Sequence, residues 1–536
     1  MCCFKVVGNF GNSSSGPSDY WRISAPLPIR ARWAKTWGES ITTQTLRARA
    51  AESVSVWVTA VAIPMMLLAP AIWNGYPLLQ SDTGGYLARW YEGYLVPSRS
   101  TVFGLYLHFG EDTYFWLNLG IQALATLWIL QLTLRVFGIV KPLQLLGLSL
   151  ALVLTTALPW LASMLLTDIF AGLSVLSLFL LVLHGDKLSG IEKFALFAFT
   201  AFAAATHSAT LAVLLGLCCV GWLVRPLLRD RIAIAGLAQG TLTIAAGAIM
   251  LLSANFALSG QLAWTPGGYG VAFGRMLQDG IVARYLQDHC PEAKLKLCPY
   301  RYELPTNADE FLWSKTSVFI TLGRFTGLND EMGFIVTHSL AEYPLWQAGA
   351  AIAATTRQLL LVATGENTNR PIPHTHGILE HYLPKQLKLV RAAYQQNGYI
   401  TFGPINLIHV PVALVSILLV FALFGRAIWQ RRLDEFTLLA ATACLALLGN
   451  AVACGVISGP HDRYGARLVW VATFVMLIAA VRRFTAANNS GKSSGGHPTI
   501  GGFPHHVQSG QGGQKFEGEK AFLREPCACA LRTRSG

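Results

Sequence analysis

The strongest constraint on this chain is the recurrence of apolar runs that are as long as a bilayer is thick. A helix of about 20 apolar residues crosses the roughly 30 Å hydrocarbon core of a membrane, and such runs recur between residues 54 and 481. Charged residues make up only 13% of the chain, about half of the roughly 25% usual for soluble domains. The sequence therefore predicts an all-α polytopic membrane protein.

Breaks and basic clusters divide these runs into about ten predicted transmembrane helices. The stretch 143–183 is too long for one helix, and Pro159 offers a break. We divide the run 194–224 near "ATHSA" (205–209), because two short helices keep the Arg cluster 225–231 on the same side as the preceding Lys-containing loop. The resulting spans are 54–72, 114–134, 143–158, 166–183, two within 194–224, 232–256, 407–424, 436–457 and 467–481.

The distribution of Lys and Arg predicts which side each segment faces. The net charge is +13, and its excess collects in the tails and short loops, which the positive-inside rule assigns to the cytoplasm. We therefore expect a multi-pass inner (plasma) membrane protein with both termini cytoplasmic, and no nucleic-acid partner. The predicted parts are a disordered cytoplasmic leader (1–52), an N-terminal transmembrane bundle (53–256) with a first outer loop (73–113), a large extracytoplasmic segment between spans seven and eight (257–404), C-terminal transmembrane helices (405–483) and a disordered cytoplasmic tail (484–536).

The large outer segment carries two signals of its own. Apolar residues recur at helical spacing between Phe273 and Leu286, which predicts helices with a buried face. Cys290 and Cys298 are the cysteines of this segment. On the oxidising side of the membrane they are expected to form a disulfide that closes a small loop, and a pair of free thiols is the alternative.

Ionisable residues that are unusual for so apolar a chain all fall on the predicted outer side. They are Asp82 in "QSDTGGY", Arg99 in "PSRSTVF", Asp168 in "LLTDIF", His207 in "ATHSA", and His461, Asp462, Arg463 and Arg467 in "GPHDRYGAR". Such residues near membrane depth are costly and tend to mark functional sites. Arginines hold phosphate oxygens bidentately, and a carboxylate can take a proton from an acceptor hydroxyl.

Each of these residues also has a structural interpretation. Asp82 suits a helix N-cap, Arg99 suits a side chain that extends to lipid headgroups, and Asp168 suits an ion pair inside the bundle. His207 suits a hydrogen-bonded turn, and the final loop suits an interfacial anchor. Asp82, Asp168, His207 and His461 also offer ligands for a divalent metal, but no ligand spacing occurs within one segment, so a metal cofactor stays open.

The layout resembles the GT-C superfamily of integral-membrane glycosyltransferases, which use polyprenyl-phosphate-linked sugars. "YPLLQSDTGGYL" is similar to the acidic motif that follows their first span, and "PSRSTVFGLYLHF" to the Arg-containing stretch further along the first outer loop. The resemblance covers residues 53–483. It implies that Asp82 is the catalytic base and that Arg99 binds the donor phosphate. Asp168, His207, His461 and Arg463 are further candidates for substrate binding.

The resemblance also implies partners and alternatives. The expected substrates are a lipid-linked sugar donor, within the lipid of the membrane, and a lipid, glycan or protein acceptor. A polysaccharide polymerase or O-antigen-ligase-like enzyme would show similar Arg- and His-containing outer loops. A transporter or flippase is the alternative from another class, but it is expected to carry ionisable residues at mid-depth and internal repeats, and the sequence has few of the former and no visible repeat.

Overall fold

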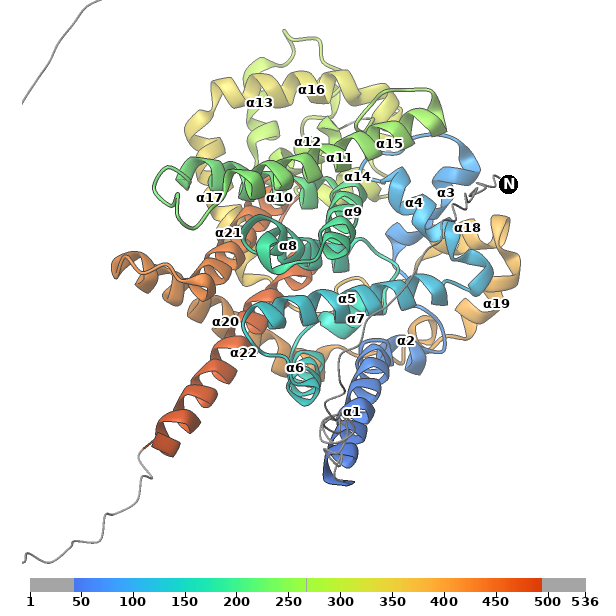
Figure 1. Cartoon of the computed structure of the whole chain (residues 1–536). Coiled ribbons are helices and arrows are strands. Elements are labelled where there is room, and N and C mark those ends of the chain that lie inside the picture. The colour runs from blue at the N-terminus through green and yellow to red at the C-terminus, as the bar shows by residue number, and fades with distance from the viewer. Residues whose placement is uncertain (1–42, 267, 494–536) are drawn as a thin grey trace, which may run out of the picture. The chain divides into compact units, whose positions relative to one another are not determined.

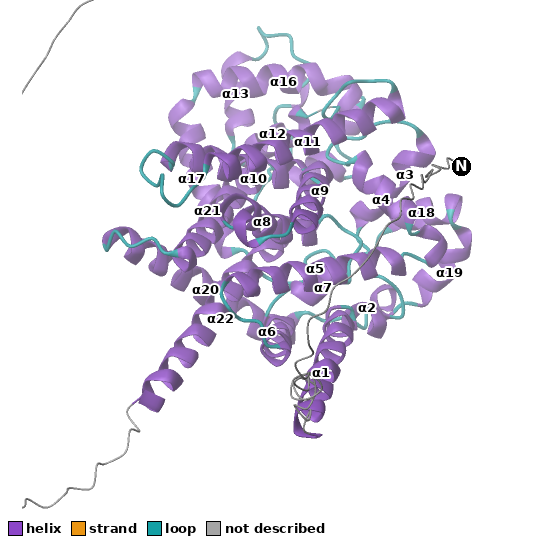
Figure 2. Ribbon diagram, viewed as in Figure 1, coloured by secondary structure: helices purple, strands orange, loops and turns teal. Residues whose placement is uncertain are grey.

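The computed structural model describes the chain from residue 43 to residue 493, except residue 267. Predictions for the rest of the leader (1–42) and of the tail (494–536) lie outside the described residues. Within that range, every regular element is helical (Figures 1 and 2). Leu78 and Met164 add one isolated parallel bridge. The all-α expectation is therefore confirmed for the described part of the chain.

The helices of the N-terminal half follow the predicted apolar runs. Their bounds are α1 (Thr43–Leu67), α2 (Ala69–Asn74), α3 (Ser81–Glu92), α4 (Thr101–Phe109), α5 (Trp116–Val136), α6 (Pro142–Thr155), α7 (Leu158–Ala162), α8 (Asp168–Leu183), α9 (Gly190–Thr206), α10 (Ser208–Val224) and α11 (Ile234–Ser259). The run 143–183 is divided as expected, but Pro159 lies in the first turn of the short α7, which separates α6 from α8. The break expected within 205–209 is present at His207. Helix α1 begins at Thr43, inside the predicted leader.

The outer segment and the C-terminal part add eleven more helices. They are α12 (Tyr269–Gln278), α13 (Ile281–His289), α14 (Ala308–Trp313), α15 (Val318–Thr321), α16 (Arg324–Glu342), α17 (Pro344–Leu360), α18 (Pro373–Tyr382), α19 (Pro384–Ala392), α20 (Gly403–Trp429), α21 (Glu435–Ile457) and α22 (Asp462–Ser493). The chain divides into two units at Val481, within α22. All the contacts discussed below lie in the first unit.

Five helices are long and apolar enough to cross a membrane. They are α5, α11, α20, α21 and the part of α22 from Asp462 to Thr485. Four shorter apolar helices accompany them: Val54–Leu67 within α1, Pro142–Thr155, Asp168–Leu183 and Ser208–Val224. A helix of 17 residues is about 26 Å long, somewhat less than the roughly 30 Å of a hydrocarbon core.

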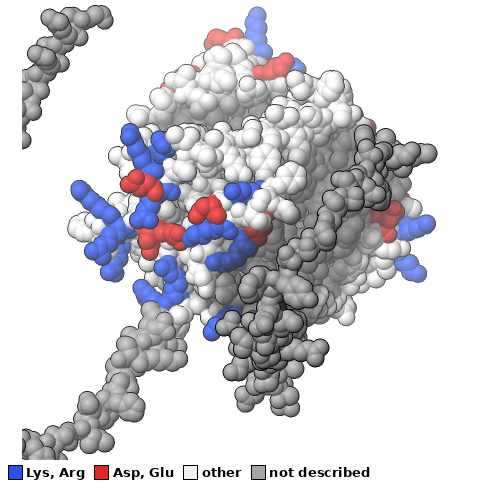
Figure 3. Space-filling model, in the orientation of Figure 1, with Lys and Arg blue, Asp and Glu red and all other residues white. Residues whose placement is uncertain are grey.

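Two groups of loops lie at opposite ends of helix α8. Ion pairs join three basic loops at one end, where Arg135 contacts Glu192 at 2.8 Å and Lys187 contacts Glu435 at 2.7 Å. Figure 3 shows a band of charged residues on one part of the visible face, smaller charged groups at the top and at the right edge, and largely uncharged surface between them. Asp168 is the first residue of α8 and lies at its other end, about 24 Å away for a helix of 16 residues. Three of the loops predicted to face the cytoplasm thus share one end of the bundle.

The outer segment 257–404 does not form one body. Helices α12 to α16 enclose a hydrophobic core of their own that includes Phe273, Ile281 and Tyr285, as the helical spacing predicted, and the Cys290–Cys298 disulfide is present beside it. Helices α18 and α19 instead place Leu379 and Val390 in the main core. The reason is that α18 packs against α3 and α17 packs along α21.

Candidate functional site

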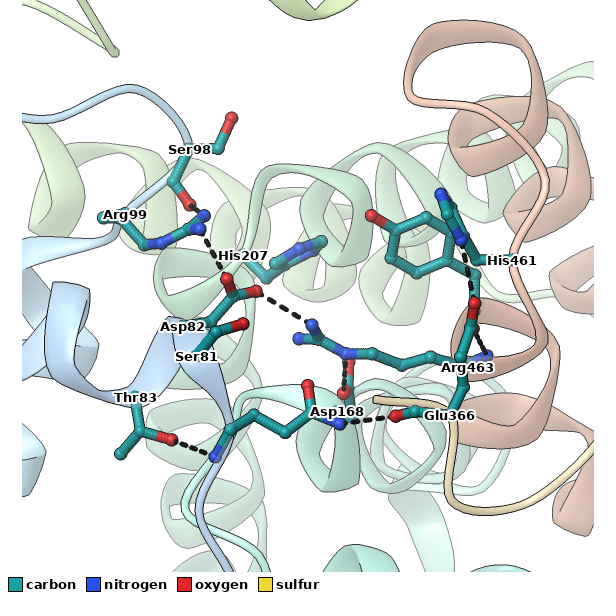
Figure 4. A network of polar contacts seen from close by, with 12 residues as sticks. Ser81, Asp82, Thr83, Ser98, Arg99, Asp168, His207, Glu366, His461 and Arg463 are labelled. Atoms are coloured by element: carbon teal, nitrogen blue, oxygen red, sulfur yellow. Dashed lines mark hydrogen bonds and ion pairs between the residues drawn. The ribbon is translucent and has the colours of Figure 1, made fainter. Parts of the chain in front are cut away.

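Asp82 shares its carboxylate between two arginines. It lies in the first turn of α3, whose N-cap is Gln80. Its Oδ1 accepts a hydrogen bond from Arg99 Nη2 at 2.6 Å, and its Oδ2 accepts one from Arg463 Nη1 at 2.8 Å (Figure 4). The Gln80 N–H donates to Thr83 Oγ1 at 3.0 Å. The N-cap interpretation of Asp82 is therefore wrong, because another residue holds that position and the carboxylate is engaged by arginines.

The glycines that follow Asp82 let other segments approach α3. A Cβ at Gly84 would lie 2.6 Å from Thr375 Cα of α18, and a Cβ at Gly85 would lie 3.2 Å from Arg99 Nε. Thr375 Oγ1 also accepts a hydrogen bond from the Gly84 N–H at 3.1 Å. The small residues of "DTGG" therefore make room for α18 on one side and for the phosphate-binding candidate Arg99 on the other.

Arg99 is held in place by its neighbours at the start of α4. Ser100 caps this helix by accepting from the Phe103 N–H, and its hydroxyl donates to the Ala205 carbonyl at 2.8 Å. Thr101 Oγ1 lies 2.7 Å from Asn255 Oδ1 and donates to it. These bonds fasten the segment that carries Arg99 to the ends of α9 and α11.

Arg463 connects the two carboxylates of the site. Its Nε donates to Asp168 Oδ2 at 2.6 Å, while its Nη1 contacts Asp82 (Figure 4). The Asp168 side chain is only 2% exposed, and it also has Arg467 Nη1 at 3.9 Å from Oδ1. Arg467 follows Arg463 by one helical turn, so both face the same side of α22. Asn450 fixes it by accepting two hydrogen bonds, at 2.6 and 3.0 Å.

His207 lies at the break between α9 and α10, next to this arginine row. Its Nδ1 is 3.3 Å from Arg467 Nη1, and its side chain is half-buried. Burial lowers the pKa of His207 well below its ordinary value, and the charges of Arg467 and Arg463 lower it further. The imidazole is therefore neutral at pH 7, and it is placed to accept a hydrogen bond from a guanidinium or from a substrate.

His461 is paired with an acid that the sequence analysis missed. Its Nδ1 lies 3.0 Å from Glu366 Oε1, and Glu366 Oε2 accepts from the Arg463 N–H at 2.8 Å (Figure 4). The His461 backbone is fixed by Gln358, which accepts from its N–H at 2.9 Å and donates to its carbonyl at 2.8 Å. The Glu366 carbonyl also accepts from Gln80 Nε2 at 2.9 Å, so this loop reaches the start of α3.

The structure brings the six predicted site residues into one network, in which some are joined directly and others through a further residue. Asp82, Arg99, Asp168 and Arg463 are joined directly. His207 joins through Arg467, and His461 joins through Glu366. Sequence reasoning missed Glu366, Asn450 and Gln358. Glu366 stands alone in the polar loop "TGENTN", and neither amide carries a motif that marks it.

The electrostatics of this network favour an anion. Burial by itself raises the pKa of the Asp82 carboxyl, but Arg99 and Arg463 outweigh burial and hold that pKa below its ordinary value. The three guanidiniums of Arg99, Arg463 and Arg467 face the carboxylates of Asp82 and Asp168, while the Glu366 carboxylate faces His461. These guanidiniums, on side chains at most 18% exposed, are suited to bidentate contacts with a phosphate.

The acids and histidines do not gather around one point. Within the described residues, no group of three or more His, Cys, Asp or Glu side chains is arranged to hold a metal ion. Asp82 and Asp168 both form ion pairs with arginine, and His461 contacts Glu366. The residues described here therefore do not fit the divalent metal left open by the sequence.

Comparisons with known proteins add no relative. No protein-family model, no curated protein and no solved structure matches this chain. Any function must therefore be inferred from the residues of the site and from their surroundings.

Proposed function

We propose that this protein is a membrane glycosyltransferase that moves a sugar from a polyprenyl-phosphate donor to a lipid, glycan or protein acceptor. The observation that carries the proposal is the cluster of Asp82, Arg99, Asp168 and Arg463. Together with Arg467, it sets three guanidiniums against two carboxylates, and one of these carboxylates is reachable from outside, since the Asp82 side chain is 23% exposed. The proposal includes about ten spans, a site at the outer face of the inner membrane and cytoplasmic termini.

A surface cavity at α2, the helix that precedes α3 in the chain, supports a lipid-linked substrate. Its volume is about 470 Å³. It is lined mainly by apolar residues of the α1–α2 and α6–α7 segments and of the stretch 399–405 that leads into α20, among them Met66, Trp73, Val153, Trp160 and Ile405. Trp73 stands nine positions before Asp82 in the chain. A prenyl chain buried against such surface gains roughly 25 cal/mol for each Å² removed from water.

The arginines account for donor binding. The donor phosphate binds the guanidiniums of Arg99 and Arg463, which otherwise contact Asp82. Losing these partners raises the pKa of the Asp82 carboxyl toward its ordinary value, because the two guanidiniums are what hold it low. Donor binding therefore turns a poor proton acceptor into a better one.

The transfer step is a displacement at the anomeric carbon of the donor. The acceptor hydroxyl oxygen forms a bond to this carbon, and the bond between the carbon and the phosphate oxygen breaks. The electron pair leaves on the polyprenyl phosphate, whose charge Arg99 and Arg463 stabilise. The hydroxyl proton passes to the Asp82 carboxylate. Asp168 orients Arg463 through the 2.6 Å contact to Nε.

Substitution of Asp82 tests this proposal. Full-length protein in membranes is incubated with radiolabelled polyprenyl-phosphate sugars, and transfer is measured at matched protein level. Asp82→Asn keeps the size and polarity of the side chain but removes the proton acceptor. We expect a loss of about 10²- to 10⁴-fold, the usual contribution of a general base, and a similar loss for Asp82→Ala.

A matched control comes from the same outer loop. Asp112 is an exposed acid in the turn after α4, so Asp112→Asn is expected to transfer at the wild-type rate. Transfer by Asp82→Asn at the wild-type rate would remove Asp82 from the chemistry. An absence of transfer by the wild-type protein from every donor tried would count against the glycosyltransferase proposal itself.

A further inference from the structure

The pairing of His461 with Glu366 has the geometry of an oriented imidazole. Glu366 is held from one side by the Arg463 N–H at 2.8 Å, and it contacts His461 Nδ1 at 3.0 Å from the other. Its own backbone is tied to Gln80. A carboxylate on one ring nitrogen sets the tautomer and the direction of the ring, and it leaves the other nitrogen for a ligand.

The second nitrogen of His461 is available. Among the described residues, Nε2 has no hydrogen-bond partner, and the side chain is 31% exposed. The ring lies edge-on to Tyr464, with the centroids 5.4 Å apart and the planes at 90°, and Gln358 locks the backbone on both sides. The imidazole is thus fixed at the N-terminal end of α22, two residues before Arg463.

We propose that His461 and Glu366 form a dyad in which Glu366 accepts a hydrogen bond from Nδ1–H, and the protonated ring donates its Nε2–H to the phosphate of the lipid-linked donor. This inference rests on the proposed function. Arg463 follows in the same turn and takes the phosphate from the side of Asp82. His461 is then a binding residue for the phosphate, and Glu366 is a positioning residue that acts through His461.

The charge of the dyad makes this contact depend on pH. The hydrogen bond from Glu366 raises the pKa of His461, burial opposes it, Asp309 of α14 raises it slightly and Arg463 of α22 lowers it, with a net increase above the ordinary value. Below this pKa the imidazolium gives the phosphate a charge-assisted hydrogen bond, which is stronger than a neutral one. Above it, the one remaining ring proton stays on Nδ1 beside Glu366, so Nε2 has no hydrogen to donate and the bond to the phosphate is lost.

The test measures the binding of undecaprenyl phosphate to the purified full-length protein between pH 5.5 and 8.5. The quantity compared is the Kd of a variant divided by the wild-type Kd at the same pH, so that the ionisation of the probe cancels. For His461→Gln we expect this ratio to be about tenfold at pH 5.5, the loss of one charge-assisted bond, and to approach one at pH 8.5. His338→Gln, an exposed histidine of α16, is the control and is expected to bind like the wild type.

Glu366→Gln separates positioning from a purely structural role. This variant keeps the shape of the side chain but removes the charge that raises the pKa of His461. As the pH is increased, the affinity for the probe is therefore expected to fall at a lower pH in the variant than in the wild type. A ratio that is constant with pH for both variants, or equal to one throughout, would overturn the dyad while leaving the proposed function intact. If the wild-type protein does not bind the probe at any pH, the proposed function and the dyad both fail.

Discussion

Removing Arg463 tests the network most directly, because this side chain is the link between two carboxylates. Arg463 is 13% exposed, and its partner Asp168 is 2% exposed. Arg463→Met keeps much of the apolar volume but leaves Asp168 with Arg467 at 3.9 Å as its remaining cation. Asp82 keeps Arg99 at 2.6 Å. Leaving one member of a buried ion pair alone costs about 3–5 kcal/mol. Because Asp168 keeps this distant cation and Asp82 is partly exposed, we expect the lower end, about 3 kcal/mol.

The assay is the unfolding of the full-length protein in mixed detergent and SDS micelles, followed by the fluorescence of its 15 tryptophans. Asp168→Asn alone and Arg463→Met with Asp168→Asn complete a double-mutant cycle, whose coupling energy is expected to be about 1–3 kcal/mol. Arg426→Met, at an exposed position of α20, is the control and should change the free energy of unfolding by less than about 0.5 kcal/mol. The reasoning is refuted if Arg463→Met stays within about 1 kcal/mol of the wild type, or if the two single effects simply add.

Three further outcomes follow from particular contacts. Gly84→Ala places a methyl group 2.6 Å from Thr375 Cα and should lower the free energy of unfolding by about 1–3 kcal/mol through overpacking. Gly120→Ala in α5, where a Cβ would have nothing within 4 Å, is the control and should not lower it. Equal melting temperatures for the two variants would contradict this. Replacing Cys290 and Cys298 by Ser opens a loop of sequence separation 8 and should cost about 2–3 kcal/mol by the loop-entropy relation, seen as a lower melting temperature that dithiothreitol no longer changes. Stability should also depend on pH. The pKa of Asp82 and that of Glu366 are lowered in the folded protein, so both carboxylates add to the free energy of unfolding above about pH 4. This contribution is lost as the pH falls through the pKa values of the folded protein. The pKa of His461 is raised, so its contribution is present below about pH 6.5 and is lost as the pH rises through the folded value; a wild-type protein and a His461→Gln variant with the same pH profile of unfolding would disprove this.

The local pattern of the sequence determined where the helices lie. Apolar runs and Pro159 predicted the division of 143–183, because helix formation depends on neighbours a few residues apart. The break near His207 was predicted instead from the basic clusters, which two helices keep on one side of the membrane. Spacing within 273–286 identified the buried faces of α12 and α13. The Cys290–Cys298 disulfide was predictable since its two cysteines are the pair in one polar segment.

The tertiary structure alone decided what the site residues contact. Asp82 and Arg463 stand 381 positions apart, and nothing in either local sequence indicates that one carboxylate would bridge Arg99 and Arg463. Glu366 is one acid in an unmarked loop, and it became part of the site only because α17 packs along α21 and carries that loop to the start of α22. Ion pairs between distant segments depend on how the helices pack, and a single sequence records the charges without recording which of them meet.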